Sequence, residues 1–196
     1  MITEKDEGKV KARLVVRGFE EKDAPQSDSP TASKDSCKLF LAICANEGFK
    51  LKTLDVTSAF LQGQPLTRDV FVQPPDEMLE EGKIWKLKKT CYGLYDASRS
   101  WYFAVKEQIE KLGMKTLSGD SSFFYLLKEG KLLGLCILHV DDFLIGGTSN
   151  FFELIECNLL NKFTFGKVQC NKFKYTGINI EQKEDGEIYI DQNEYI

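Results

Sequence analysis

The sequence predicts a domain of the α+β class. Strand-like and helix-like segments interleave along the 196 residues, without the regular strand–helix–strand alternation of a doubly wound sheet. Two pairs of strand candidates are joined by tight turns, at Glu129-Gly130 and at Asp185-Gly186. With 42% hydrophobic and 12% aromatic residues, the chain can bury a core without disulfides or metals.

The N-terminal segment is expected to be a long basic strand. Residues 9–19 are rich in β-branched side chains and alternate between basic and apolar residues, which is typical of a strand with one buried face. The basic face holds Lys9, Lys11 and Arg13. The polar segment 20–30 contains two prolines and is expected to be a loop.

The next elements are predicted from hydrophobic spacing and from end signals. In order, they are a helix over 36–46, a strand over 49–56, a short turn or helix over 57–62, and short strands over 70–72 and 84–87. Ser33 or Asp35 can cap the helix, and Gly48 stands where its C-terminal stop belongs.

The second half is predicted to contain two more helices and two hairpins. These elements are a helix over 99–112, hairpin strands over 122–128 and 131–140, a short strand over 143–145, a helix over 150–160 and a C-terminal hairpin. Ser98 can cap the first of these helices, and Gly113 follows its end.

Composition excludes several classes of protein. The apolar fraction excludes a wholly disordered chain, and no apolar run approaches the roughly 20 residues of a membrane-spanning helix. The six cysteines form no CxxC pair, so buried or free thiols in a reducing compartment are expected, and His139 has no cysteine at zinc-ligand spacing. The net charge of −4 means that any nucleic-acid binding depends on local basic patches.

Three carboxylates stand out from the apolar sequence around them. Asp55 ends an apolar strand, while Asp141 and Asp142 interrupt the apolar stretch 132–145. Such a pair is common in turns, and taken alone it favours a structural reading. If Asp55 lies beside the hairpin, however, the three could hold two Mg²⁺ ions about 3.5–4 Å apart, the arrangement for in-line attack on phosphorus.

Ordered sequence blocks that cover nearly the whole chain resemble the reverse transcriptase domain of copia-type LTR retrotransposons. The blocks are Lys11-Ala-Arg-Leu-Val-Val-Arg-Gly-Phe19, Leu54-Asp-Val-Thr-Ser-Ala-Phe-Leu-Gln-Gly63, Val70-Phe-Val-Gln-Pro-Pro75, Cys91-Tyr-Gly-Leu-Tyr-Asp-Ala-Ser-Arg-Ser-Trp-Tyr102, His139-Val-Asp-Asp142, Tyr175-Thr-Gly-Ile-Asn-Ile180 and Ile190-Asp-Gln-Asn-Glu-Tyr-Ile196. Each block is weak evidence alone, but their order along the chain makes the resemblance specific.

The resemblance implies the fingers and palm of a right-hand polymerase, with the palm a mixed or antiparallel sheet packed on helices and carrying a catalytic β-hairpin. Fingers sequence is expected over 1–48, and palm over 49–196 with a fingers insertion at about 63–97. The connection or thumb side would start after about 165, within a single reverse transcriptase domain. The chain is expected to be a piece of a longer protein, without a full thumb or RNase H region.

The implied activity is that of an RNA-directed DNA polymerase, which adds dNTPs to a primer 3′-hydroxyl. The metal-binding aspartates of the family fall on Asp55, Asp141 and Asp142, and the backbone carbonyl of Val56 is a further candidate ligand. Two Mg²⁺ or Mn²⁺ ions are expected there. One would lower the pKa of the 3′-hydroxyl, and the other would steady the triphosphate and the leaving pyrophosphate.

Further residues are implied for the nucleotide and the primer. Phe60 falls where the family places an aromatic ring under the sugar, and its alternative is a plain core residue. Candidates to hold the triphosphate are Lys11, Arg13 and Arg17, and their alternative is a solvated basic strand face. His139, Val140 and Arg99 are expected near the primer and template.

The sequence departs from the family pattern at three positions. Asp96 replaces the Gln that packs against the incoming nucleotide, and an anionic side chain there weakens binding unless it faces away or binds a cation. Ser98 replaces the following Pro, and His139 replaces the Tyr of the hairpin. These departures favour an alternative, a catalytically silent or domesticated remnant that keeps the fold and weak nucleic-acid binding.

The expected partners are an RNA or DNA template with its primer, dNTPs, and the rest of a Pol polyprotein, including integrase and RNase H. No membrane association or secretion is expected; the location would be the cytoplasm, in a virus-like particle for an intact element, or the nucleus. A nucleotide cyclase is a third reading, because that class also sets acidic pairs on a hairpin. The basic N-terminal strand and Trp101-Tyr102 speak against it.

Overall fold

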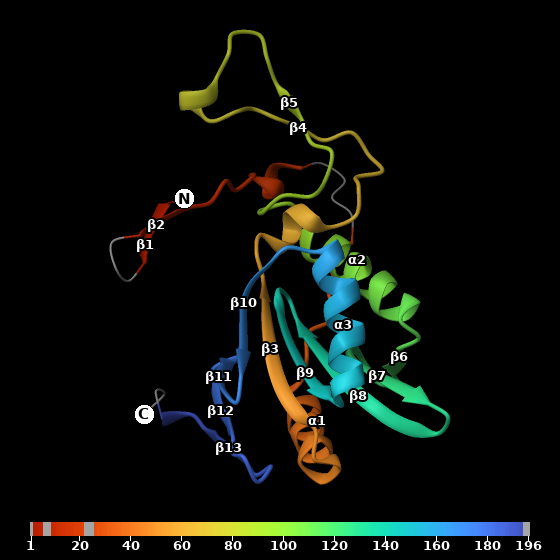
Figure 1. Ribbon diagram of the computed structural model, residues 1–196. Helices are drawn as coiled ribbons and strands as arrows, with labels where there is room; N and C mark the ends of the chain where they lie inside the picture. Colours follow the sequence, from red (N-terminus) through yellow and green to blue (C-terminus); the bar gives the residue numbers. More distant parts are fainter. Residues whose placement is uncertain (1, 6–8, 22–25, 194–196) are drawn as a thin grey trace. The chain divides into compact units, whose positions relative to one another are not determined.

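The computed structural model describes residues 2–5, 9–21 and 26–193, and its chain divides into two compact units (Figure 1). The first unit comprises residues 1–29 and 59–105. The second unit comprises residues 30–58 and 106–196. The mixed fold, with a main antiparallel sheet and three α-helices among the described residues, confirms the α+β prediction.

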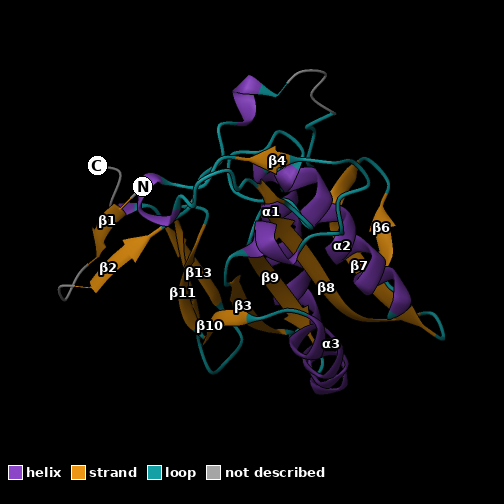
Figure 2. Ribbon diagram, turned by 90° about the horizontal axis from the view of Figure 1, so that it is seen from above, coloured by secondary structure: helices purple, strands orange, loops and turns teal. Residues whose placement is uncertain are grey.

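The second unit is built on a six-stranded antiparallel sheet with the strand order β10-β3-β9-β8-β7-β6 (Figure 2). Its strands are β3 (Lys50–Val56), β6 (Lys115–Leu117), β7 (Asp120–Lys128), β8 (Lys131–His139), β9 (Asp142–Gly147) and β10 (Phe165–Cys170). A smaller sheet contains β11 (Lys172–Tyr175), β12 (Ile178–Gln182) and β13 (Ile188–Asp191). The helices are α1 (Lys34–Glu47), α3 (Ser149–Lys162) and the C-terminal part of α2 (Ala97–Lys111).

Glycines in the middle of the main sheet allow helices to approach it from both faces. A Cβ on Gly146 would lie 2.4 Å from Cys44 Sγ of α1, and one on Gly147 would lie 2.5 Å from the Phe151 ring of α3. Neighbouring strand residues point to opposite faces, so α1 and α3 cover opposite faces of the sheet. The core on the α1 side also takes Phe173, Tyr175 and Ile180 from the smaller sheet.

The first unit has less regular structure. It contains the hairpin β1 (Ile2–Lys5) and β2 (Lys9–Ala12), the pair β4 (Phe71–Val72) and β5 (Trp85–Lys86), and most of α2. Short 3-10 helices cover Gly18–Glu20 (η2), Ala59–Gln62 (η3) and Asp76–Met78 (η4). A small core gathers Val70, Leu94 and Ala97, with Val16, Phe60, Leu66, Val72 and Leu87 packed against it.

The end signals of α1 are confirmed. The Ser33 hydroxyl accepts a hydrogen bond from the Ser36 amide at 3.0 Å, which makes Ser33 and not Asp35 the N-cap. Gly48 ends the helix in the left-handed region at φ +64°. The hairpin turns at Glu129-Gly130 and Asp185-Gly186 are also confirmed, since they connect β7 with β8 and β12 with β13.

The structure corrects two predictions. The N-terminal strand ends at Ala12 and not at residue 19. Among the described residues, the following segment is joined to residues 91–94 by the backbone bond from Val16 N to Tyr92 O at 2.7 Å and pairs in no strand ladder. Helix α2 begins at Ala97, so Ser98 lies inside its first turn and is not the cap. The Ser98 hydroxyl instead donates to the carbonyl of Ser27 at 3.5 Å.

The cysteines and the helices of the described residues bear on two expectations from composition. All six cysteines are free thiols, four of them buried. No helix in the described ranges has both the length and the apolar character needed to cross a bilayer.

Replacing Gly146 by alanine should destabilise the chain by about 1–3 kcal/mol, because the new methyl group overlaps Cys44 and forces α1 away from β9. The measurement is the urea midpoint of Gly146→Ala against the wild type. In a Cys44→Ala background the same substitution should cost less, because the overlapping sulfur is gone. Strict additivity of the two substitutions would contradict this close approach.

Candidate active site

The three carboxylates come together where β9 begins, between β8 and β3. Asp142 is the register partner of His139 on β8 and of Asp55 on β3. Directly opposed residues in antiparallel strands project to the same face of the sheet. His139, Asp142 and Asp55 therefore form one row across three neighbouring strands. Together with Asp141 in the adjoining loop, Asp55 and Asp142 are called the carboxylate row, and they form the candidate active site of the second unit.

The loop between β8 and β9 completes the row. It contains only Val140 and Asp141, and Val140 has φ +57°, a region that β-branched residues rarely adopt. Two-residue hairpin loops require such backbone angles, so the tight turn imposes strain on Val140. The carbonyl of Asp141 accepts a hydrogen bond from the Val56 amide at 3.0 Å. This bond ties the loop to the end of β3, next to Asp55.

The electrostatics of the row reflect the crowding of its charges. Burial raises the pKa of Asp142 to about 6, and the nearby charges of Asp141 and Asp55 add to the effect. His139 Nδ1 is buried and has no hydrogen-bond partner in the part of the chain that the structure describes. A cation beside these carboxylates would relieve their repulsion.

Gly166 on β10 lies beside Asp55 and was not predicted from the sequence. The β10–β3 pairing shifts register between Phe165 and Val168, opposite Asp55. A Cβ on Gly166 would lie 3.2 Å from Asp55 Oδ2 and 2.9 Å from Thr57 Oγ1. The glycine thus leaves room for the carboxylate. An isolated Gly among strand residues is a sequence signal for such a bulge or close approach, and Gly166 carries this signal.

The donor set fits a hard divalent cation that is shared with a substrate. Among the described residues, no group of three or more His, Cys, Asp or Glu side chains could hold a metal ion by itself. Mg²⁺ usually takes one or two protein carboxylates and completes its coordination with substrate phosphates and water. Asp55, Asp141 and Asp142 supply carboxylates of this kind, so they fit an ion bound together with a phosphorylated ligand.

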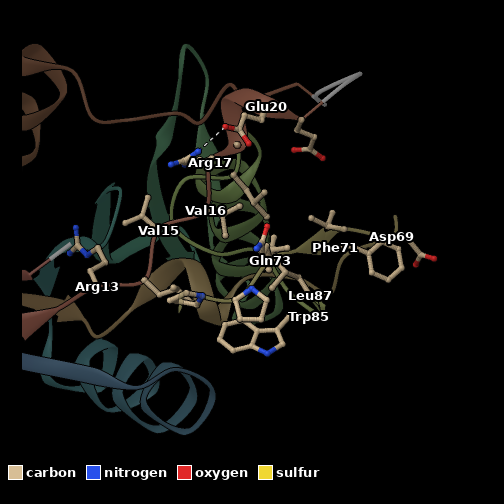
Figure 3. Close-up of a pocket in the computed structure, with 18 of the residues that line it drawn as sticks. Arg13, Val15, Val16, Arg17, Glu20, Asp69, Phe71, Gln73, Trp85 and Leu87 are labelled. Atoms are coloured by element: carbon tan, nitrogen blue, oxygen red, sulfur yellow. Dashed lines mark hydrogen bonds and ion pairs between the residues drawn. The ribbon is translucent and has the colours of Figure 1, made fainter. Parts of the chain in front are cut away.

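The other expected site residues lie in the first unit, which contains a cavity of about 1150 Å³ (Figure 3). One side is lined by the extended segment 13–18, including Arg13 and Arg17. The other side is lined by β4, β5 and the residues around them, including Phe71, Gln73 and Trp85. The cavity therefore offers aromatic faces together with cationic groups.

Arg13, Arg17 and Lys11 have different surroundings. The guanidinium carbon of Arg13 lies 4.4 Å from the ring centroid of Tyr92. Arg17 makes an exposed ion pair with Glu20 at 3.3 Å. Lys11 lies in β2, and its side chain is outside the described part of the structure.

The carboxylate of Asp96 binds a cation, the guanidinium of Arg68, which is one of the two conditions under which an anionic side chain at this position need not weaken nucleotide binding. Arg68 makes two hydrogen bonds to its carboxylate, and the Arg68 Nε donates to Glu21 Oε1 at 2.9 Å. The hydrogen bond to Asp96 raises the pKa of Arg68, against the opposing effect of burial. Arg99, the remaining candidate, donates to the carbonyl of Asp28 at 3.2 Å. The expected site residues thus form two sets, one in each unit.

The sequence profile described as "Reverse transcriptase (RNA-dependent DNA polymerase)" matches residues 1–196. The chain belongs to this family.

Its relatives include Pol polyproteins of plant retrotransposons. The chain is 33% identical to the retrovirus-related Pol polyprotein from transposon RE1 of Arabidopsis thaliana over 143 residues, 70% of this chain and 10% of that protein. Identity to the RE2 polyprotein of the same plant is 27% over 191 residues, 94% of this chain and 13% of that protein. Identity to the polyprotein of transposon TNT 1-94 of Nicotiana tabacum is 34% over 144 residues, 70% of this chain and 11% of that protein. The chain thus spans about a tenth of these relatives, and the copia-type resemblance is confirmed.

Asp142→Asn should stabilise the metal-free protein near neutral pH. Because the folded-state pKa is raised from 3.8, the folded state binds more protons than the unfolded state between about pH 4 and 6, and the free energy of unfolding falls as pH rises through this window. In EDTA at pH 7.5, urea unfolding should show a gain of about 1 kcal/mol, discounted for solvent screening of the half-exposed carboxylate. At pH 4 the gain should vanish.

Asp120→Asn is the matched control. Burial raises the pKa of Asp120, but hydrogen bonds from Ser122 and Ser36 outweigh it and lower the pKa overall. This variant should therefore lose stability at pH 7.5. A loss at Asp142→Asn as well would contradict the repulsion within the carboxylate row.

Proposed function

We propose that this chain carries the polymerase site of a copia-type Pol polyprotein and adds dNTPs to a primer 3′-hydroxyl on an RNA or DNA template. The observation that carries the proposal is the carboxylate row: Asp55 and Asp142 are register partners, and Asp141 is tied to the end of β3. In a chain of the reverse transcriptase family, this donor set matches the chemistry of phosphoryl transfer.

We assign the fingers to residues 1–48 and to an insertion at about 63–97, and the palm to the rest of 49–196, with the connection or thumb side after about 165. The main sheet and its carboxylate hairpin lie in the palm range, which supports this assignment. Helix α1 packs on the main sheet, so the boundary near residue 48 depends on family likeness and not on packing.

The carboxylate row would hold two Mg²⁺ or Mn²⁺ ions through Asp55, Asp141 and Asp142, with the backbone carbonyl of Val56 as a further ligand. When bound, the ions would lower the pKa of the primer 3′-hydroxyl and stabilise charge on the leaving pyrophosphate. The hydrogen bond from Val56 to Asp141 keeps the hairpin loop beside β3, and Gly166 leaves space for the Asp55 carboxylate. The first contact fixes the backbone that carries Asp141 and the second gives the Asp55 side chain room, so both would favour a site that is arranged before substrate binds.

The first unit would bind the nucleotide. Arg13 and Arg17, with Lys11, would neutralise the triphosphate, and the ring of Phe60 would exclude a ribose 2′-hydroxyl. Arg68 offsets the charge of Asp96, which permits an acidic residue at this position. His139, Val140 and Arg99 are proposed to lie near the primer and template.

The proposed partners are a template with its primer, dNTPs, and the integrase and RNase H parts of a Pol protein, and the Pol polyprotein relatives support the polyprotein context. The proposed location is the cytoplasm, within a virus-like particle, or the nucleus.

A catalytically silent remnant is the second candidate. It is favoured by the departure at His139, which replaces the Tyr of the family hairpin and is the register partner of Asp142. The two candidates differ in a single property, which is primer extension in the presence of a divalent cation.

Primer extension on an RNA template should occur with Mg²⁺ or Mn²⁺ and stop in EDTA. Asp141→Asn should lower the rate by at least about 100-fold, because it removes a ligand charge from the metal site. Asp185→Asn, an Asp in the turn between β12 and β13, is the control and should keep the wild-type rate. A folded wild-type chain that extends no primer, even with manganese and excess primer–template, would support the silent remnant.

A further inference from the structure

We propose that Tyr92 is a positioning residue that sets sugar selection, because it holds both Phe60 and Arg13. This inference rests on the proposed function, in which Phe60 lies under the sugar and Arg13 holds phosphate. Tyr92 belongs to the same unit as both residues.

The ring of Tyr92 contacts both groups directly. The guanidinium carbon of Arg13 lies 4.4 Å from its centroid, within the range of a cation–π interaction. The Phe60 ring centroid lies 4.9 Å away, with the two planes at 53°, which is a favourable distance for an aromatic pair. One side chain therefore links the proposed phosphate ligand with the proposed sugar gate.

Backbone contacts fix the segment that carries Tyr92. The Tyr92 carbonyl accepts a hydrogen bond from the Val16 amide at 2.7 Å, three residues beyond Arg13. The buried Thr90 hydroxyl donates to the carbonyl of Phe60 at 2.8 Å. The segment is thus bonded on one side to the chain of Arg13 and on the other to η3, which carries Phe60.

Two glycines bring these segments close together. A Cβ on Gly93 would lie 1.9 Å from the Val16 carbonyl oxygen, and one on Gly18 would lie 2.0 Å from the Gly93 carbonyl oxygen. Gly93 also has φ +94°, which a residue with a side chain rarely adopts. Any larger residue at either position would separate the segments, so Tyr92 is held in register with Arg13.

This arrangement matters because selection against a ribose depends on where the Phe60 ring lies. A displacement of about 1 Å at a reacting or selecting group can change rates by about 100-fold. An Arg side chain that is already held loses less rotamer freedom when it binds phosphate. The Tyr92 ring would therefore contribute to both nucleotide affinity and sugar selection, whereas a merely structural residue would change neither selectively.

The test is the ratio of kcat/KM for a dNTP to that for the matching rNTP during primer extension. In Tyr92→Leu this ratio should fall about tenfold or more, and the KM for the dNTP should rise, because both ring contacts are lost. Tyr92→Phe keeps the ring and should keep the ratio within about twofold. Should Tyr92→Leu fail to fold, Tyr92→Met keeps the side-chain length without the ring.

Two further variants separate the proposed roles. Arg13→Gln should raise KM for dNTP and rNTP alike and leave their ratio unchanged. Phe152→Leu is the matched control, because Phe152 also contacts a cation, Lys52 at 4.5 Å, and a second ring, Phe151 at 6.1 Å, but lies in the other unit. It should leave the ratio unchanged. A folded Tyr92→Leu variant with the wild-type ratio would overturn the inference.

Equilibrium binding separates this inference from the proposed activity. Titration with dATP and ATP in the presence of Ca²⁺ measures sugar preference without turnover. A preference for dATP that is lost in Tyr92→Leu supports the inference even if the wild type extends no primer. Equal or absent binding of the two nucleotides by the wild type, or a preference that survives in Tyr92→Leu, overturns it. Absence of extension alone overturns only the proposed polymerase activity.

Discussion

The register of β9 between β8 and β3 is the constraint on which the rest of the second unit depends. It places Asp142 opposite both His139 and Asp55, and a slip of one residue would turn every β9 side chain to the other face. The helices favour this register, because Gly146 leaves space for α1, and Gly147 together with Gly134 on β8 leaves space for α3. Packing far from the carboxylates therefore determines where the carboxylates project.

The same arrangement places two unfavourable interactions, charge repulsion and backbone strain, at one end of the sheet. Asp142 is crowded by two like charges, and Val140 has a backbone angle that suits glycine. Such strain persists only where the surroundings over-determine the structure, and the fully buried strand interior of β8 and β9 provides those surroundings. These interactions lower the free energy of unfolding, and the same geometry holds the carboxylate groups close together. Reduced stability at a strained, charged site is typical of sites that bind a charged ligand.

Local signals in the sequence predicted local structure well. Helical spacing and the caps Ser33 and Gly48 predicted α1, and turn residues predicted both hairpins. The proximity of Asp55 to the hairpin followed from family likeness, because no spacing rule connects residues 86 positions apart. Gly166 and Tyr92 were missed because their roles depend on contacts between distant segments. The N-terminal strand was predicted too long because alternation cannot show whether a partner strand exists.

The ion pair between Arg68 and Asp96 has a consequence for the history of this chain. The Arg68 side chain is less than a third exposed and makes hydrogen bonds to Asp96 and Glu21. Replacing either Arg68 or Asp96 alone by a neutral residue would therefore leave a partly buried charge without this partner. The acidic residue at 96, where the family pattern has Gln, therefore depends on the guanidinium at 68, and the two positions are expected to be energetically coupled. Descendants of this chain would be expected to exchange both positions together, because either change alone leaves a partly buried charge without its partner.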